Sequence, residues 1–488
     1  MSEPRVVILG AGPAGVGAAR QLRLREDARV TVVEQRESVG GNAGSFTLAG
    51  QRVDYGSHRL HPACDPEILS DIREMLGDEL VRRPRHGRIR LRGRWIHFPL
   101  RPLDLLLRLD RAFALGALRD SLLGVLPGVS AAGGPDGDGG AGTDGEEGDD
   151  FASVLEASLG PTICRDFYFP YARKIWGREP DELSAVQARR RVSANSVGKL
   201  VRKVLGRLPG VKPAGFSHFY YPKDGYGRIS EAYAEDARRR GAEFLLGWSA
   251  SSVRRGPADG GWTVVAERDG ETRELPADYV WSTVPIPLLA RLVRPSAPEE
   301  VLEAAGSIRY RSMLLVYLAL GTDRFSEYDA HYFPGEDVSI TRLSEPKNYA
   351  GVDRPAGRTT LCAELPCSEE DPVWEAGDDE LAGRVADDLA AAGIPLPAAP
   401  ERTHVVRLSH AYPIYLSGYE EPFGRLDRWA TALPGILTYG RQGLFAHDNT
   451  HHALAMAYAA ADCLEGGAFD RERWADYRED FEEHVVED

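Results

Sequence analysis

The chain has 488 residues, of which 43% are hydrophobic and 27% are charged. This composition is typical of a globular protein with two or three domains of roughly 150 residues, and it excludes collagen, coiled coil and wholesale disorder. The net charge of −15 argues against a nucleic acid or an anionic membrane as the partner, although it is compatible with local basic pockets.

The first predicted elements are a strand over residues 5–9, a helix over 16–24 and a strand over 30–33. A turn, Gly10-Ala-Gly-Pro-Ala-Gly15, separates the first strand from the helix. Glycine lets the backbone approach a pyrophosphate, whose charge then lies at the N-terminus of the helix. An acid at the end of the second strand would accept hydrogen bonds from an adenosine ribose. The segment therefore predicts a dinucleotide site with Gly10, Gly12, Pro13, Ala14, Gly15, Glu34 and Gln35.

Residues 81–94 hold seven arginines and no acid. Arg88, Arg90 and Arg92 alternate with apolar residues, as in a half-buried strand. Two interpretations stay open: the arginines focus a positive potential in a substrate cleft, or they form the solvent-facing side of an edge strand.

Leucines and alanines recur at helical spacing over residues 102–126, which predicts one or two amphipathic helices packed on the core. Residues 131–150 are almost entirely Gly, Asp, Glu, Ala and Thr, so we expect a disordered insertion there. Helical patterning resumes at residue 151 and extends to about 208.

Beyond residue 220, strand and helix patterns alternate. We expect helices over residues 229–240 and 378–392, and strands over 243–246, 262–267, 279–282, 313–320 and 360–364. Residues 435–440 predict a strand that enters a glycine turn, and residues 453–464 an alanine-rich helix.

The five cysteines are odd in number and show no spacing typical of a metal site, so we expect reduced thiols, as in a cytoplasmic protein. The first residues form no signal-peptide pattern. We also expect no membrane span, because no run of roughly 18 uncharged apolar residues occurs.

Two blocks carry a family resemblance: Glu34-Gln-Arg-Glu-Ser-Val-Gly-Gly-Asn42 and Val53-Asp-Tyr-Gly-Ser-His-Arg-Leu-His61. With the dinucleotide motif, they resemble the FAD-dependent amine oxidase superfamily, in the branch that holds UDP-galactopyranose mutase and the protoporphyrinogen-oxidase-like oxidoreductases. The resemblance implies FAD as the cofactor, with Gly41, Asn42 and His58 beside the flavin ring. We expect the FAD to be noncovalent, because no His or Cys stands at a position that suggests a flavin linkage.

Later blocks follow in the same order as in that branch. Tyr171-Ala-Arg-Lys-Ile-Trp-Gly177 is similar to a mutase block that borders the substrate cleft, and residues 440–449 resemble the C-terminal flavin segment. The resemblance therefore implies cofactor contacts from Gly440, Arg441, Asp448 and Asn449, and substrate contacts from Tyr171, Trp176, Arg190, Arg342 and Tyr412.

The sequence departs from the mutase pattern at two places. Ala194 stands where the mutases carry an arginine that contacts the nucleotide diphosphate, although arginines occupy positions 189–191. Ala446-His447 replaces a tyrosine pair before the flavin-contacting acid. These departures leave the reaction open.

Three polar features near the expected flavin need separate interpretation. His58 is either a polar neighbour of the flavin or a buried histidine with satisfied hydrogen bonds. Arg342 either binds an anionic substrate or the reduced flavin, or is an ion-pair partner of Glu345. The histidine-rich segment 447–452 could suggest a metal, but no carboxylate or cysteine lies at ligand spacing, so we expect no metal site.

We therefore predict an α/β fold, with a discontinuous Rossmann-like FAD-binding domain and an inserted substrate domain of mixed β-sheet and helices. The FAD-binding domain is expected over residues 1–62, 220–290 and 430–465, and the substrate domain over 63–130, 151–219 and 291–429. Residues 466–488 are expected to form an acidic helix or tail.

The leading hypothesis is an FAD-dependent oxidoreductase that abstracts a hydride from a carbon bearing a hydroxyl or amine, or that desaturates its substrate. Its catalytic candidates are His58, Arg342 and Tyr412. The alternative is a redox-neutral mutase that would use reduced FAD to convert a sugar nucleotide from pyranose to furanose. A third hypothesis is a flavin fold retained for binding alone. The expected partner is a small molecule, with a nucleotide sugar as one candidate, and the oligomeric state stays open.

Overall fold

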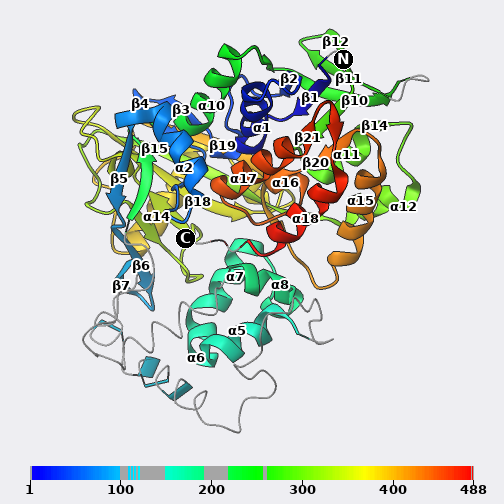
Figure 1. The fold of residues 1–488 in the computed structure, drawn as a ribbon. Helices are drawn as coiled ribbons and strands as arrows, with labels where there is room; N and C mark the ends of the chain where they lie inside the picture. The colour runs from blue at the N-terminus through cyan, green and yellow to red at the C-terminus, as the bar shows by residue number, and fades with distance from the viewer. Residues whose placement is uncertain are drawn as a thin grey trace, which may run out of the picture.

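The computed structural model describes residues 3–98, 108–109, 112–113, 115–116, 119–120, 149–191, 218–256, 261–484 and 486. Two sheet-based regions lie side by side in Figure 1, and a group of helices labelled α5 to α8 lies below them in that view. No helix in the described ranges is long and apolar enough to cross a membrane.

A five-stranded parallel sheet forms the first region, and its strands come from distant parts of the chain. Short runs of β-branched residues, buried on both faces, are typical of such a sheet. The strands expected over residues 5–9, 30–33, 243–246 and 279–282 all occur in it. Their order is β20 (Ile436–Thr438), β13 (Tyr279–Ser282), β1 (Arg5–Leu9), β2 (Arg29–Glu34) and β9 (Glu243–Leu246).

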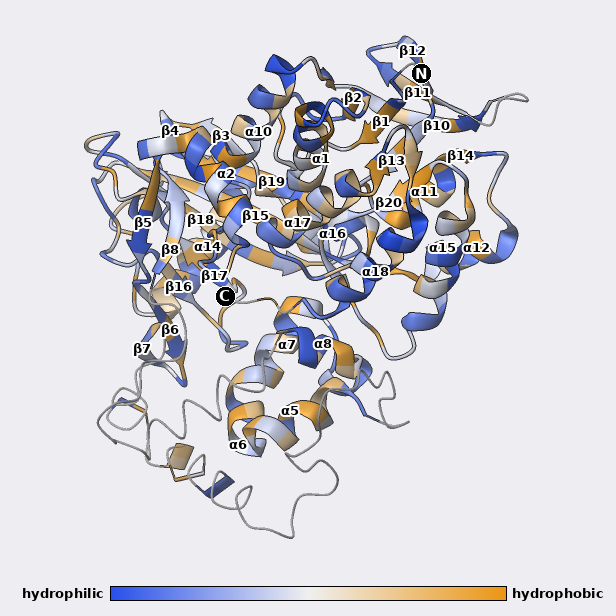
Figure 2. Cartoon of the chain, viewed as in Figure 1, coloured by the Kyte–Doolittle hydropathy of each residue, from blue (hydrophilic) through white to orange (hydrophobic). Residues whose placement is uncertain are grey.

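Helices cover both faces of this sheet. One hydrophobic cluster joins the sheet to α1 (Pro13–Leu24), α2 (Pro66–Leu76), α10 (Arg228–Arg239), α17 (Thr450–Asp462) and α18 (Arg471–Glu482). A second cluster joins it to α11 (Ile286–Leu292), α12 (Glu299–Ser307) and α15 (Glu420–Ala432). In Figure 2, β1, β13 and α11 are among the elements that carry the hydrophobic colour. Helices α2, α12 and α15 thus pack on the parallel sheet, although the sequence placed them in the substrate domain.

A seven-stranded mixed sheet forms the second region. Its central strands contain the predicted segments 313–320 and 360–364. The order is β19 (Arg402–Ile414), β15 (Arg309–Leu320), β18 (Thr359–Cys367), β17 (Arg342–Ser344), β16 (Ala330–Tyr332), β6 (Gly87–Leu91) and β7 (Arg94–Phe98). Helices α14 (Asp378–Ala391) and α13 (Pro346–Ala350) accompany it.

Smaller elements complete the fold. A four-stranded sheet has the order β12 (Glu271–Ala277), β11 (Trp262–Arg268), β10 (Ser249–Arg255) and β14 (Val293–Arg294). The two-stranded sheets are β3 (Ser45–Leu48) with β4 (Gln51–Asp54), β5 (Leu80–Pro84) with β8 (His218–Pro222), and β21 (Leu464–Glu465) with β22 (Ala468–Phe469). All five cysteines fall within the described residues, where they are buried and free.

The arginine-rich strand is not an edge strand, because β6 lies between β16 and β7. The Arg88 guanidinium lies over the rings of Trp95 and Tyr328, at 4.1 and 4.6 Å from their centroids. Arg90 pairs with Asp337. These arginines are therefore held by aromatic rings and acids of the same sheet region.

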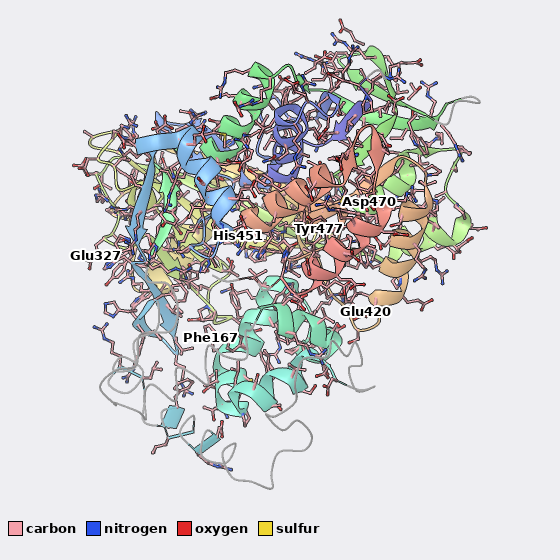
Figure 3. The ribbon with its side chains drawn as sticks, viewed as in Figure 1. Phe167, Glu327, Glu420, His451, Asp470 and Tyr477 are labelled. Atoms are coloured by element: carbon pink, nitrogen blue, oxygen red, sulfur yellow. The ribbon has the colours of Figure 1, made fainter. Side chains whose placement is uncertain are left out.

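The group of helices is formed by α5 (Phe151–Leu159), α6 (Pro161–Ile163), α7 (Phe169–Trp176) and α8 (Ala185–Arg191), with a π-helical turn at Cys164–Tyr168. Figure 3 labels Phe167 in this group and Glu420 on α15 above it. The Ser184 hydroxyl donates to Glu420 Oε1 at 2.9 Å and so links the two. Residues 131–148 of the predicted insertion, most of the predicted helix 102–126 and the segment 192–208 lie outside the described residues. Asp150, the last residue of the predicted insertion, is the N-cap of α5 and accepts from the Ser153 N–H at 2.7 Å.

Candidate active site

A cavity of about 430 Å³ lies where four strands of the parallel sheet end. The loops that follow β1, β2, β13 and β20 all contribute to its walls. In open parallel sheets, ligands bind at the carboxyl ends of the strands. The lining includes the expected residues Gly10, Gly12, Pro13, Ala14, Glu34, Gln35, Gly41, Asn42, His58, Gly440, Arg441, Asp448 and Asn449.

The glycines of the first turn have three separate roles. Gly10 adopts a φ of +97°, which favours glycine, and its N–H donates to the Val33 carbonyl at 2.8 Å. A Cβ at Gly12 would meet no atom within 4 Å, so this position leaves the cavity open. A Cβ at Gly15 would lie 1.9 Å from the Gly10 carbonyl oxygen, so Gly15 allows α1 to approach the turn and does not itself line the cavity.

Glu34 is fixed at the end of β2 by two backbone hydrogen bonds. Its Oε2 accepts from the Ala11 N–H at 2.8 Å, and its Oε1 accepts from the Arg36 N–H at 2.9 Å. The carboxylate therefore joins the first turn to the loop after β2, with its remaining acceptor capacity at the cavity wall, as a ribose site requires.

The first cavity carries an excess of positive charge. Among its described lining residues, six arginines stand against two carboxylates: Arg36, Arg59, Arg85, Arg342, Arg407 and Arg441 against Glu34 and Asp448. Helix α1 also begins at this cavity, with Gly12 as N-cap, Pro13 at its first position and no acid in its first turn. Positive charge and a helix N-terminus both suit a pyrophosphate. The residues thus fit a dinucleotide.

A second, smaller cavity of about 120 Å³ adjoins the first. The two share eight described lining residues: Asn42, Ser57, His58, Arg342, Leu408, Arg441, Asp448 and Asn449. Within the described residues, the glycine turn and Glu34 line only the first cavity. The second cavity therefore joins the first at the end away from the pyrophosphate and ribose positions.

His58 stands at this junction. Its Nε2 lies 2.8 Å from the Asn42 carbonyl oxygen and 3.0 Å from that of Tyr55. Because a carbonyl oxygen only accepts, Nε2 carries the proton. The ring stacks on Tyr226 with centroids 5.3 Å apart. Burial lowers the pKa of His58, against an opposing effect of Asp54. His58 is therefore a neutral imidazole in a fixed orientation.

Arg342 pairs with Glu364, not with Glu345. Arg342 Nε donates to Glu364 Oε1 at 3.0 Å, and Nη2 donates to Oε2 at 2.8 Å. The two residues are cross-strand partners on β17 and β18. Glu345 instead accepts from the N–H groups of Phe325 and Ser326. The alternative in which Arg342 pairs with Glu345 is therefore wrong, because the chain turns into α13 directly after β17 and carries Glu345 away from Arg342.

Tyr412 and Tyr171 both line the second cavity, Tyr412 from β19 and Tyr171 from α7. The Arg441 guanidinium lies 5.2 Å from the centroid of the Tyr412 ring and donates to the Ala411 carbonyl oxygen at 2.7 Å. The segments that resemble mutase blocks thus come together here. Two expected substrate contacts line neither cavity: Trp176 is buried in the core of the helical group, and Arg190 lies over the Tyr415 ring at 5.9 Å.

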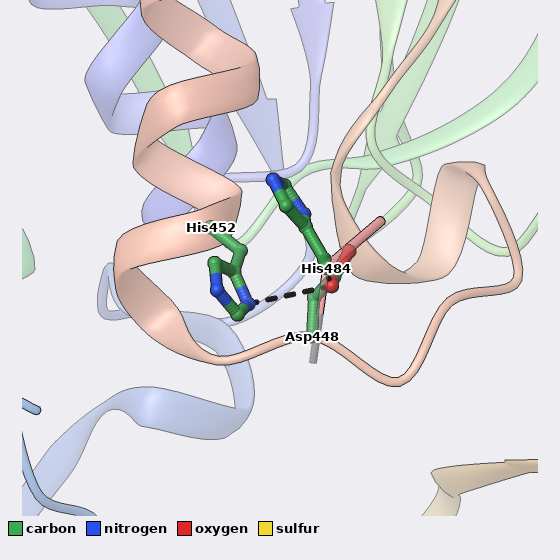
Figure 4. Close-up of side chains that lie close together, drawn as sticks. All are labelled: Asp448, His452 and His484. Carbon is green, nitrogen blue, oxygen red and sulfur yellow. Dashed lines mark ion pairs between the residues drawn. The ribbon is translucent and has the colours of Figure 1, made fainter. Parts of the chain in front are cut away.

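Asp448 faces two imidazoles at the N-terminus of α17 (Figure 4). Its Oδ1 lies 3.4 Å from Nδ1 of His452 and 3.4 Å from Nδ1 of His484. Burial by itself would raise the pKa of Asp448, but the two imidazoles hold it below its usual value. The expectation that no carboxylate lies at ligand spacing from these histidines is wrong, because Asp448 stands four residues before His452 and the segment after α18 brings His484 to the same carboxylate.

These three side chains nevertheless do not present metal-ligand geometry. The rings of His452 and His484 stack with centroids 4.2 Å apart and an angle of 15° between their planes. An ion held in the plane of one imidazole would lie out of the plane of the other. Nδ1 of His452 also accepts from the Asn449 N–H at 3.3 Å. The trio is therefore best described as a buried carboxylate shared by stacked imidazoles.

Sequence reasoning missed several residues of the site. Glu364 gave one detectable signal, an acid that directly follows three apolar residues at the end of the predicted strand 360–364. Thr283 follows β13, lines the first cavity and donates to the Leu9 carbonyl oxygen at 2.8 Å. Val486 lines the second cavity, and its N–H donates to the Arg190 carbonyl oxygen at 3.0 Å. Nothing in the local sequence around Val486 predicted that position.

The fold and the first cavity define a dinucleotide-binding protein, and comparisons with known proteins make the class specific. Residues 13–462 match the family model described as flavin containing amine oxidoreductase. The chain therefore belongs to the flavin-containing amine oxidoreductase family, and its cofactor is FAD. This confirms the expected family, the enzyme class and the cofactor.

Individual relatives are distant. Polyamine oxidase 4 of Oryza sativa subsp. japonica is 37% identical over 81 residues, which is 17% of this chain and 16% of the relative. A putative flavin-containing monoamine oxidase, AofH, of Mycobacterium tuberculosis is 29% identical over 189 residues, which is 39% of this chain and 40% of the relative. The chain thus matches well under half the length of these curated relatives.

Two solved structures share the fold over nearly the whole chain. A reduced UDP-galactopyranose mutase has a TM-score of 0.78 at 21% identity, with 97% of this chain and 96% of the other covered. A putative protoporphyrinogen oxidase from Exiguobacterium sp. 255-15 has a TM-score of 0.70 at 21% identity, with 95% and 98% covered. These structures confirm the predicted fold class, a Rossmann-like sheet with a mixed substrate sheet.

Proposed function

We propose that this chain is an FAD-dependent oxidoreductase that oxidises a small molecule in the second cavity, by hydride abstraction from a carbon bearing a hydroxyl or amine, or by desaturation. One observation carries the proposal: the second cavity joins the cofactor cavity at His58 and Arg342, away from the glycine turn. A substrate in it would lie against the flavin end of the cofactor. When bound, FAD supplies a two-electron acceptor.

The side chains of the second cavity suit substrate orientation. Tyr55, Tyr171 and Tyr412 provide hydroxyl groups on aromatic walls, while Met313 and Leu315 contribute apolar surface that excludes water. His58 keeps its proton on Nε2, so Nδ1 is its only atom that can accept a hydrogen bond. We assign His58 and Tyr412 to substrate and cofactor orientation, and Arg342 to the support of the His58 loop.

Anaerobic flavin spectra test this proposal. The purified protein is mixed with alcohols, amines and nucleotide sugars without oxygen, and bleaching of the flavin absorbance by one of them supports an oxidoreductase. If no compound bleaches the flavin and a nucleotide sugar is isomerised only after dithionite reduction, the protein is a mutase instead.

The redox-neutral mutase remains the second candidate because Arg342 and Tyr412 do meet in one cavity beside the cofactor site. Two features disfavour it: Arg342 is already paired with Glu364, and Arg190 lines neither cavity. The third candidate, binding without catalysis, predicts that the protein is purified without flavin.

A further inference from the structure

The two adjoining cavities differ in charge. The cofactor cavity has six described arginines against two carboxylates, whereas the described lining of the second cavity has two of each: Arg342, Arg441, Glu364 and Asp448. Burial lowers the pKa of His58, which keeps it neutral at this boundary. The positive potential that suits a pyrophosphate therefore does not extend into the second cavity.

These charges are also engaged within the protein. Arg342 and Glu364 form a bidentate pair with side chains only 17% and 5% exposed. Glu364 Oε1 accepts in addition from the Ser57 N–H at 2.8 Å, and Arg342 Nη2 donates to the Ser57 carbonyl oxygen at 3.4 Å. The pair thus holds both backbone groups of the residue before His58. A ligand that drew either member out of the pair would therefore also release this loop.

The remaining two charges also face groups of the protein. Arg441 covers the Tyr412 ring and donates to the Ala411 carbonyl, while Asp448 faces His452 and His484. The surfaces that a ligand meets are instead the tyrosines of the cavity, Thr341, and apolar side chains such as Ile175 and Leu408.

We infer that the substrate group received by the second cavity is uncharged and polar, an alcohol or a neutral carbonyl compound, neither a polyamine nor a nucleotide diphosphate. This inference rests on the proposed function. A cationic group would compete with Arg342 for Glu364, and an anionic group would compete with Glu364 for Arg342. Leaving one partner of a buried pair without its counter-charge costs about two to three orders of magnitude in affinity.

The test uses three probes of the same shape and different charge: cyclohexanol, cyclohexylammonium and cyclohexanecarboxylate. Each is titrated into the FAD-loaded protein at neutral pH, and binding is read from the perturbation of the flavin spectrum, which needs no turnover. We expect cyclohexanol to bind at least about tenfold more tightly than either charged probe, with no dependence on added salt. Equal or tighter binding of a charged probe overturns the inference.

Matched variants test the role of the pair. Arg342→Gln leaves Glu364 unpaired, so the ammonium should gain about tenfold or more in affinity. Glu364→Gln leaves Arg342 unpaired, so the carboxylate should gain instead. The double variant R342Q/E364Q is again neutral and should restore the preference for cyclohexanol. If a single variant does not retain FAD, the parent and the double variant still show in which order of affinity the three probes bind.

The outcomes separate this inference from the proposed function. Flavin bleaching by a charged substrate would overturn the neutral-substrate inference and leave the oxidoreductase proposal intact. If neutral probes bind but no neutral compound bleaches the flavin, the oxidoreductase proposal is overturned and the neutral-substrate inference is kept. Failure of all three probes to bind the parent and the variants would overturn the assignment of this cavity to the substrate.

Discussion

Arg342 and Glu364 face each other across neighbouring antiparallel strands and are joined by two hydrogen bonds, at 3.0 and 2.8 Å. Both also bond to the backbone of Ser57, the residue before His58. The pair therefore connects the mixed sheet to the loop at the junction of the two cavities, and its first role is to fix that loop.

We predict strong energetic coupling between these two residues. Arg342→Ala or Glu364→Ala alone should lower the free energy of unfolding by about 3 to 5 kcal/mol, because each leaves a buried charge unpaired. The double variant should lower the free energy of unfolding by less than the sum of the two single variants. Urea unfolding of the four proteins gives the coupling energy. Arg254 and Glu274, with side chains 47% and 61% exposed, provide the control cycle, where the coupling should stay below about 1 kcal/mol. Equal coupling in both cycles would contradict the prediction.

The two glycines of the first turn should respond differently to substitution. Gly12→Val places its side chain into open cavity at an ordinary φ of −67°, so the variant should fold normally and lose FAD. Gly15→Ala meets a backbone oxygen at 1.9 Å, so it should lose stability as well as flavin. The ratio of flavin absorbance to protein and the melting temperature of the flavin-free forms measure these effects. Full flavin occupancy in Gly12→Val would refute the site assignment.

Sequence reasoning succeeded where the signal is local. The strands at Val6 and Val280 belong to short apolar runs. The glycine turn beside them is recognisable because a pyrophosphate site requires glycine there. It failed where the outcome depends on strand register or on chain segments meeting in space. No local pattern shows that Glu364, rather than Glu345, lies opposite Arg342. Strand β19 was missed because charged and polar residues interrupt its apolar ones, although it borders the longest buried strand.

The pH dependence of stability should reflect His331, which is 1% exposed. Burial, reinforced by the Arg88 guanidinium, lowers the pKa of His331 to about 3, from an ordinary value of 6.5. Between these values the unfolded chain binds a proton that the folded protein does not, so stability falls as the pH drops from about 6.5 toward 3. Relative to His331→Gln, the parent should lose up to about 1.4 kcal/mol per pH unit between pH 6 and 4. Parallel pH profiles of the two proteins in urea unfolding would contradict this.

Arg20 should be a major determinant of stability in the FAD-binding region. It is 4% exposed and donates to Asp236 at 2.9 Å and to Asp71 at 2.6 Å, which links α1 to α10 and α2. Arg20→Met should cost about 3 to 5 kcal/mol, because it leaves Asp71 without its cationic partner, whereas Asp236 keeps Arg239 and Arg240. Arg25→Met is the control on the same helix end: its pair with Asp462 is partly exposed and should be worth under about 1 kcal/mol. Chemical denaturation of the flavin-free proteins measures both, and a similar loss in the two variants would contradict the assignment.

The cofactor cavity is assembled from the two ends of the chain, since the turn at Gly10 and the segment from Gly440 to Asn449 both line one space. During synthesis, the first wall emerges long before the second exists. At about 5 to 20 residues per second, the interval amounts to roughly 20 to 90 seconds. A ribosome-bound chain that stops before residue 440 should thus be unable to retain flavin, and cofactor supply in the cell acts on the finished polypeptide rather than on the growing one.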